Sequence, residues 1–66
     1  MKNNIRVERA ILRITQQQLA EKIGVSRQTI NAIEADKYVP STVLALKIAR
    51  TCNKAVEEIF FLEDTD

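Results

Sequence analysis

Gly24, the only glycine in the chain, separates two short segments that each carry a narrow apolar stripe. Glycine adopts the left-handed conformation that ends a helix without a steric penalty, so the pattern predicts helices over residues 16–23 and 27–34. A turn of three residues makes two helices cross steeply, and such a crossing needs a small residue like Ala20 on its inner face. The residues expected to fill the angle between these helices are Leu19, Ile23, Val25, Ile30 and Ile33.

Polar residues mark the starts of the predicted helices. Thr15 with Gln18 forms a capping box before the second helix, and Ser26 and Ser41 are favoured N-caps before the third and fourth. The remaining helices are predicted over residues 5–12, 42–51 and 56–61. The fourth helix is apolar around much of its circumference and is expected to be central. Asp36 is expected in the left-handed conformation, which Asp tolerates better than most residues. The fold class is therefore all-α, with five helices.

The composition excludes several functions. The chain has 66 residues, no histidine, one cysteine and one glycine. A chain of this length is expected to be a single domain, residues 1–66, which is marginal on its own unless a partner adds stability. It cannot form an internal disulfide, lacks the commonest general base and has no glycine-rich phosphate loop. We therefore expect no enzyme activity, no cofactor and no metal site, and we expect Cys52 to be a small buried apolar residue.

Location is constrained by what the sequence does not contain. No apolar run approaches the roughly 20 residues that a membrane-spanning helix needs. The first residues lead directly into mixed charges, which is not the pattern of a signal peptide. With a lone thiol and no export signal, the expected compartment is the cytoplasm, with no membrane partner.

The net charge of +1 conceals an asymmetry along the chain. Residues 1–54 contain all ten basic residues and four acidic ones, a net charge of +6, whereas residues 55–66 contain five acidic residues and no basic one. A basic body with an acidic end is suited to a polyanionic partner that contacts the body. The same distribution also describes an ordinary solvated surface with an acidic tail, so charge alone does not decide between them.

Four polar side chains remain on the outer faces of the third helix: Arg27, Gln28, Thr29 and Asn31. An α-helix fits the major groove of B-DNA, where its N-terminal residues reach the base edges. Arg can bind guanine O6 and N7 together, and Gln or Asn can do the same with N6 and N7 of adenine. The alternative is that these are surface residues and that the Thr29 hydroxyl only serves the helix end.

Residues 16–34, QQQLAEKIGVSRQTINAIE, resemble the helix-turn-helix of the Cro and phage-repressor family (XRE family). The small Ala, the turn Gly and the apolar positions all match that family's pattern. The likeness extends to the Pro-Ser pair at 40–41, to residues 44–49 and to residues 57–60, as in compact stand-alone members. It implies a five-helix, lambda-repressor-like DNA-binding domain across residues 3–62.

The resemblance also implies roles for individual residues. Base reading or contact with adjoining phosphates falls to the four polar residues of the third helix. The positions that match phosphate contacts are Gln16, Lys37, Tyr38 and Ser41. Arg9 and Glu34 match a buried ion pair that ties the first helix to the third. Members of this kind usually bind double-stranded DNA at palindromic operators as homodimers, and they repress or otherwise regulate transcription.

The chain departs from the family pattern at three places. Ala35-Asp36 replaces the common Asn-Gly, which removes an Asn phosphate contact and is expected to place a negative charge near DNA. Ala55 replaces a Ser at the start of the last helix, where it caps less well. Glu8 replaces a usually apolar residue, and we expect Val7 to compensate for it.

The C-terminal residues suggest how two copies associate. The spacing from Val56 predicts that Phe60 enters the core, which leaves other apolar side chains without a partner in the monomer. The predicted homodimer interface comprises Phe61, Leu62, Val43 and Leu46. Related compact members suggest that residues 2–4 also pair as a short strand with residues 61–63.

A protein-interaction module is the alternative function. An antitoxin-like or adaptor protein could use the same fold to bind a protein partner, and the apolar end and acidic tail would fit that role. Binding of DNA, or co-purification with a partner in the absence of DNA binding, discriminates between the two.

Overall fold

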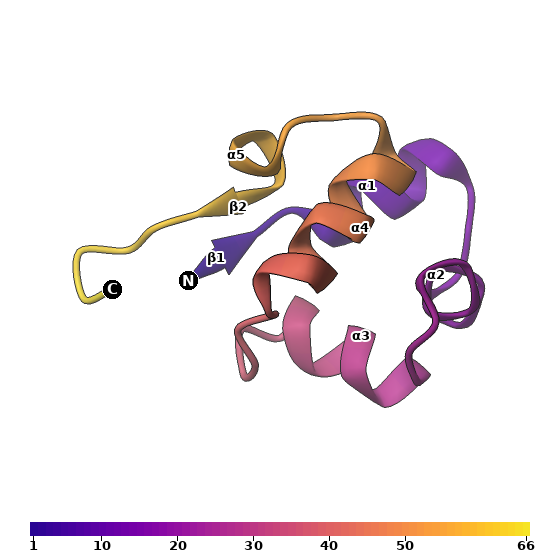
Figure 1. Ribbon diagram of the computed structural model, residues 1–66, viewed down its shortest axis with the longest axis horizontal. Helices are drawn as coiled ribbons and strands as arrows, with labels where there is room; N and C mark the ends of the chain where they lie inside the picture. Colours follow the sequence, from indigo (N-terminus) through magenta and orange to yellow (C-terminus); the bar gives the residue numbers. More distant parts are fainter.

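The computed structural model describes all 66 residues. Its elements, in chain order, are β1 (Lys2–Asn3), α1 (Ile5–Leu12), α2 (Gln16–Ile23), α3 (Arg27–Glu34), α4 (Thr42–Cys52), α5 (Val56–Ile59) and β2 (Phe60–Phe61). Helix α4 crosses the middle of the molecule in front of α1, with α2 and α3 at one end and α5 with the two strands at the other (Figure 1). The predicted all-α fold with five helices is confirmed.

The predicted caps begin the helices. The Thr15 hydroxyl accepts from the backbone N–H of Gln18 at 3.0 Å, and the Gln18 side chain accepts from the N–H of Thr15 at 2.8 Å. Ser26 and Ser41 accept from backbone N–H groups of the first turns of α3 and α4, at 3.2 and 3.1 Å. These bonds satisfy amide groups that have no partner within their helix.

Left-handed residues end or follow most of the helices. Gly24 has φ +81°, and its N–H donates to the carbonyl of Ala20, which closes α2 as predicted. Asp36, just after α3, has φ +61° and is also left-handed as expected. Arg13 and Asn53 take the same conformation after α1 and α4, so the chain reverses sharply after each of these helices.

The core is one apolar cluster that all five helices enter. Helix α4 contributes four of its members, which makes it central as predicted. Phe60 is buried as expected, and Cys52 is a buried free thiol. The members are Ile5, Leu19, Ala20, Ile23, Ile30, Ile33, Leu44, Ile48, Ala49, Cys52, Ile59 and Phe60. None of the helices combines the length and apolar character that crossing a membrane requires.

The prediction that Val7 compensates for Glu8 is wrong. Val7 is 54% exposed, whereas Glu8 is 2% exposed and lies on the inner face of α1 one turn after Ile5. Its carboxylate is bound by the ammonium group of Lys54, with 2.9 Å between Oε2 and Nζ. A salt bridge with a basic residue that follows α4 therefore takes the place of an apolar contact.

The two chain ends pair as a short antiparallel sheet, with its register displaced from the prediction. Lys2 lies opposite Phe61, and Asn3 lies opposite Phe60. Helix α5 accordingly ends at Ile59, two residues earlier than expected, because Phe60 adopts an extended conformation. No side chain of Ala55 caps this helix; instead the Glu58 carboxylate accepts from the N–H of Ala55 at 3.0 Å.

Candidate nucleic-acid interface

The first turn of α3 presents two long polar side chains that have no partner within the protein. Arg27 and Gln28 are exposed, and neither side chain makes a hydrogen bond or ion pair in the structure. The helix that carries them is fixed from behind, because Ile30 and Ile33 are buried in the core. A rigid helix therefore holds two side chains that are free to bind an external group.

Thr29 and Asn31 are held by neighbouring side chains. Thr29 is half-buried, and its hydroxyl lies 3.0 Å from that of Ser26 at the start of the helix. The Asn31 Oδ1 accepts from the Gln16 side chain at 3.3 Å. Both remain beside the exposed turn of α3, but each shares its hydrogen-bonding capacity with another residue.

Gln16 joins the start of α2 to α3. Its Nε2 donates both to Asn31 and, at 3.2 Å, to Oε1 of Glu34. The side chain is half-buried and is oriented by these two acceptors. Gln16 therefore lies beside Asn31, one of the polar residues of α3.

Arg9 and Glu34 are in direct contact across the molecule. The Arg9 Nε and Nη2 atoms donate to the two carboxylate oxygens of Glu34 at 2.6 and 3.0 Å, and Nη1 donates to the carbonyl of Ile14 at 3.2 Å. The Glu34 side chain is only 2% exposed, and its hydrogen bonds raise the pKa of Arg9. This two-point contact between a buried carboxylate and a partly buried guanidinium group ties α1 to α3 and sets the position of the exposed turn.

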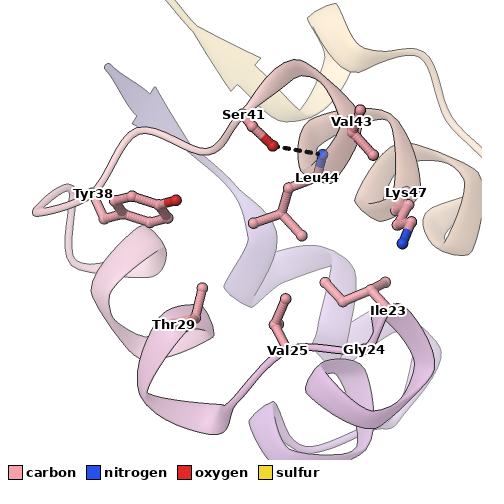
Figure 2. A pocket seen from close by; sticks show the side chains of 9 residues that line it. All are labelled: Ile23, Gly24, Val25, Thr29, Tyr38, Ser41, Val43, Leu44 and Lys47. Atoms are coloured by element: carbon pink, nitrogen blue, oxygen red, sulfur yellow. Dashed lines mark hydrogen bonds between the residues drawn. The ribbon is translucent and has the colours of Figure 1, made fainter.

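A hollow opens between α3, the following loop and the start of α4. Figure 2 shows Thr29 and Tyr38 on one side of this hollow and Lys47 on the other, with Val25 and Leu44 between them. Ser41 lines it as well and is also the N-cap of α4. The full lining is Ile23, Gly24, Val25, Thr29, Tyr38, Ser41, Val43, Leu44 and Lys47. We call it the α3 hollow.

Lys47 is a residue of this surface that sequence reasoning missed. Because Lys47 lies within the apolar run of α4, the sequence pattern assigns it to a central helix and not to a binding surface. Its spacing of four residues from Val43 places both on one face of the helix, and that spacing was the available signal. Lys37, which the sequence does assign to this surface, is exposed but does not line the hollow.

Three of the four acidic residues of the body, residues 1–54, are neutralised within the protein, whereas most of its cations are not. The fourth, Glu21, accepts only from the uncharged Gln17 side chain. Glu8, Glu34 and Asp36 each bind a basic side chain, so little negative field from them reaches solvent. Six basic residues have no carboxylate within 4.0 Å: Arg13, Lys22, Arg27, Lys37, Lys47 and Arg50. The surface therefore presents more free positive charge than the net value of +1 suggests.

The Asp36 carboxylate is paired within the protein. It is bound by Lys2 Nζ at 3.3 Å and by Asn3 Nδ2 at 3.1 Å. The Asp36 side chain is thus directed to β1; that its charge lies near DNA stays a prediction.

The residues assigned to a dimer interface are all exposed, but they do not form one patch. Leu46 lines a second, mainly apolar hollow together with Val39, Val56 and Phe60, between α4, α5 and the loop after α3. Val43 instead lines the α3 hollow. The exposed fractions are 64% for Val43, 53% for Leu46, 42% for Phe61 and 83% for Leu62. Val39, 61% exposed, is an apolar residue at this hollow that the sequence did not assign to it. Phe61 and Leu62 do not line this hollow and lie on and directly after β2. We use the name apolar face for four exposed apolar residues, Val39 and Leu46 at the hollow and Phe61 and Leu62 at the C-terminal end.

The geometry defines a class of protein. Two helices of eight residues cross at a single left-handed glycine, and the second is anchored in the core with its first turn exposed. This arrangement is a helix-turn-helix domain, the class that inserts its second helix into the DNA major groove.

Sequence comparison gives the family. The helix-turn-helix family matches residues 5–59, and the chain belongs to it. An uncharacterized HTH-type transcriptional regulator of Methanocaldococcus jannaschii is 52% identical over 66 residues, which cover both chains completely. One from Bacillus subtilis is 45% identical over 97% of each chain, and one from Archaeoglobus fulgidus is 46% identical over this whole chain and 94% of the relative. The resemblance predicted from residues 16–34 is confirmed.

Proposed function

We propose that the protein is a sequence-specific DNA-binding transcriptional regulator that places α3 in the major groove. The observation that carries this function is the pair of exposed, unpartnered side chains, Arg27 and Gln28, on the first turn of a helix fixed in the core. Family membership and relatives named as transcriptional regulators support it.

Base reading is assigned to α3. The guanidinium group of Arg27 is free to donate two hydrogen bonds to O6 and N7 of a guanine, and the amide of Gln28 suits an adenine. Asn31 and Thr29 adjoin these residues and contact bases or the nearest phosphates. Because Asn31 already accepts from Gln16, its contacts depend on the position of that side chain.

Phosphate contacts flank this reading helix. Gln16 approaches the DNA backbone at the start of α2, while Lys37, Tyr38 and Ser41 do so from the loop and the start of α4. Lys47 extends this set, because it lines the α3 hollow with Tyr38 and Ser41 and has no carboxylate partner. Cations and hydroxyl groups around a reading helix fix its register on the duplex.

The proposed active form is a homodimer that binds a palindromic operator and represses transcription by occupying it. The apolar face supplies the contact, since Leu62 and Leu46 are mostly exposed in a chain too small to cover them. A two-fold axis through this face sets the two α3 helices about 34 Å apart, one turn of B-DNA.

Selection from random double-stranded oligonucleotides with the purified protein tests this function. We expect an enriched palindrome whose half-sites are spaced by about one helical turn, and binding that weakens as salt rises. An Arg27→Ala variant run in parallel identifies which enriched base pair depends on α3. Enrichment of no sequence, or binding that is independent of salt, would overturn the proposal.

A protein-interaction role is the second candidate, and exposed apolar residues away from α3 favour it. Val7 and Ile11 lie four residues apart on α1 and are 54% and 62% exposed. An antitoxin-like or adaptor protein would bind its partner through such a surface. Co-purification of a defined partner from cells, with no shift of any selected DNA, would establish this role instead.

A further inference from the structure

The Asn3 side chain joins three separate parts of the fold. Its Nδ2 donates to the carbonyl of Ile33 at 2.8 Å and to Oδ1 of Asp36 at 3.1 Å. Its Oδ1 accepts from the backbone N–H of Ile5 at 3.1 Å. One amide group on β1 therefore contacts the last turn of α3, the second residue after α3 and the first turn of α1.

The end of α3 needs such support because its reversal is made by a residue other than glycine. The N–H of Asp36 donates to the carbonyl of Ile33 at 3.0 Å, and the N–H of Lys37 donates to that of Ala32 at 2.9 Å. This pair of bonds closes a helix with a left-handed residue, a position that favours glycine. Asp36 occupies it at φ +61°, so the reversal is strained unless side-chain contacts hold it.

Contacts from β1 supply that hold. Besides the bond from Asn3, the ammonium group of Lys2 lies 3.3 Å from the Asp36 carboxylate. Pairing of Lys2 with Phe61 and of Asn3 with Phe60 keeps both side chains in register beside the loop. The loop held in this way leads directly into Lys37 and Tyr38.

We propose that Asn3 is a positioning residue of the DNA interface. It holds Asp36 in the left-handed conformation, and thereby fixes the direction in which Lys37 and Tyr38 leave α3 toward a DNA phosphate. It also keeps the Asp36 carboxylate on β1, so that this charge does not repel the duplex. This inference rests on the proposed DNA-binding function, but the loop conformation can be measured without DNA.

The first test measures amide hydrogen exchange in the free protein. Asn3→Ala is expected to raise the exchange rates of the Asp36 and Lys37 amides by about tenfold or more, while amides in the middle of α4 change little. Adding Asp36→Gly to that variant is expected to restore protection, because glycine adopts the left-handed conformation unaided. Unchanged exchange at both amides in Asn3→Ala would overturn the proposal.

The second test measures coupling to DNA binding on the selected operator. In the native background Lys37→Gln is expected to weaken binding several-fold, and in the Asn3→Ala background the same change is expected to have a smaller effect. Asn3→Ala with Asp36→Gly is expected to bind more tightly than Asn3→Ala alone. Equal effects of Lys37→Gln in both backgrounds would contradict positioning by Asn3.

A gentler variant covers the case in which Asn3→Ala unfolds. Lys2 is 63% exposed, so Lys2→Gln removes only the ion pair with Asp36. It is expected to speed exchange at Asp36 and to weaken operator binding, with Arg13→Gln, a cation unpaired in the structure, as the control for loss of charge. An effect of Lys2→Gln no larger than that of the control would count against the proposal. Failure of the native protein to bind any DNA would refute the function, while the exchange data still decide the role of Asn3 in the loop.

Discussion

At the scale of single residues, Glu34 organises the proposed DNA interface without belonging to its exposed surface. Its buried carboxylate accepts from Arg9 on α1 and from Gln16 on α2, while its own backbone forms the last turn of α3. Three helices are therefore oriented by one side chain. The Gln16 amide is the point where this buried network meets the polar residues of α3.

Arg27 gives the most direct prediction of base reading. Arg27→Ala should weaken binding to the selected operator by about 1–3 kcal/mol and relax preference at one base pair. Folding stability should hardly change, because the side chain is exposed and makes no contact that the fold needs. Titration of operators that differ at single base pairs checks the loss, with Gln17→Ala on the exposed side of α2 as the control. An equal loss at every base pair would assign Arg27 to the phosphates instead.

Lys47 tests the proposed phosphate contacts, and Lys22 supplies a matched control. Lys47 lines the α3 hollow, whereas Lys22 lies in a different hollow with Ile14 and Glu21. Lys47→Gln should weaken binding to all sequences alike and reduce the slope of log K against log salt by about one unit. Lys22→Gln removes the same charge and should change the slope less. Equal slopes for the two variants would place Lys47 outside the interface.

Sequence reasoning from local pattern predicted which residues of α3 are exposed. It missed contacts with residues far away in the chain, apart from the Arg9–Glu34 pair that the family resemblance implied. Arg27 and Gln28 follow an N-cap by one and two positions, so their exposure was predictable. Asn3 could not be found in this way, because its partners Ile33 and Asp36 lie about thirty residues away in the chain. Lys47 was hidden for a different reason, namely that it interrupts an otherwise apolar helix.

At the scale of elements, the turn between α2 and α3 depends on Gly24. A Cβ atom added there would meet nothing within 4 Å, so a substitution is opposed by backbone conformation alone. Gly24→Ala should therefore lower the free energy of unfolding by about 1 kcal/mol, and Gly24→Asn by less, because Asn tolerates the left-handed region. Urea denaturation of the three proteins measures both differences. A loss of several kcal/mol would mean that the side chain does meet a neighbour.

The salt bridge between Glu8 and Lys54 predicts a dependence of stability on alkaline pH. The hydrogen bond to Glu8 raises the pKa of Lys54 above its ordinary value of 10.5. A cation whose pKa is raised by folding contributes stability that is complete below the unfolded pKa and is lost as the pH rises through the folded one. Lys54→Ala should thus lower stability at neutral pH, by leaving a buried carboxylate unpaired, and should remove this alkaline loss.

Urea unfolding of the native protein and of Lys54→Ala, from about pH 7 to about pH 11.5, measures how the free energy of unfolding of each depends on pH. Burial also raises the pKa of the Cys52 thiol above its ordinary value of 9.0. The folded protein therefore loses stability as the pH rises above about 9.0, because the thiol ionises more readily in the unfolded chain. Both proteins should therefore carry Cys52→Ala. If the free energy of unfolding had the same pH dependence in both proteins, the Glu8–Lys54 pair would not cause the alkaline loss of stability. Glu8→Leu with Lys54→Ala should recover stability, since an apolar pair often replaces a buried ion pair without loss.

The helices and their ends were largely predictable, because they follow from capping groups and left-handed residues within a few positions of each other. The Thr15 and Gln18 capping box and the turn at Gly24 are examples. The prediction that Val7 compensates for Glu8 failed because the spacing from Ile5 puts Glu8, and not Val7, on the buried face of α1. Helix α5 ends earlier than predicted because pairing with β1 places Phe60 and Phe61 in a strand.

At the scale of the whole molecule, association through the apolar face should be required for tight operator binding. Leu46→Glu is expected to convert a dimer to a monomer and to weaken binding to the full palindrome far more than binding to one half-site. Ile11→Glu changes another exposed apolar residue, on α1 and outside that face, and should leave the dimer intact. Sedimentation equilibrium and titration of both DNA fragments check the two effects. A monomeric native protein with full affinity would exclude the proposed dimer.

The free cations described above have a consequence for how the protein would find its operator. Three of the body's four carboxylates are held in internal pairs. In a DNA-binding protein, the unpaired Arg and Lys side chains would then attract any duplex, whatever its sequence. Such loose, sequence-blind attachment lets a protein slide and hop along DNA. The internal salt bridges of this small fold would then shorten its search along the chromosome, in addition to holding its helices together.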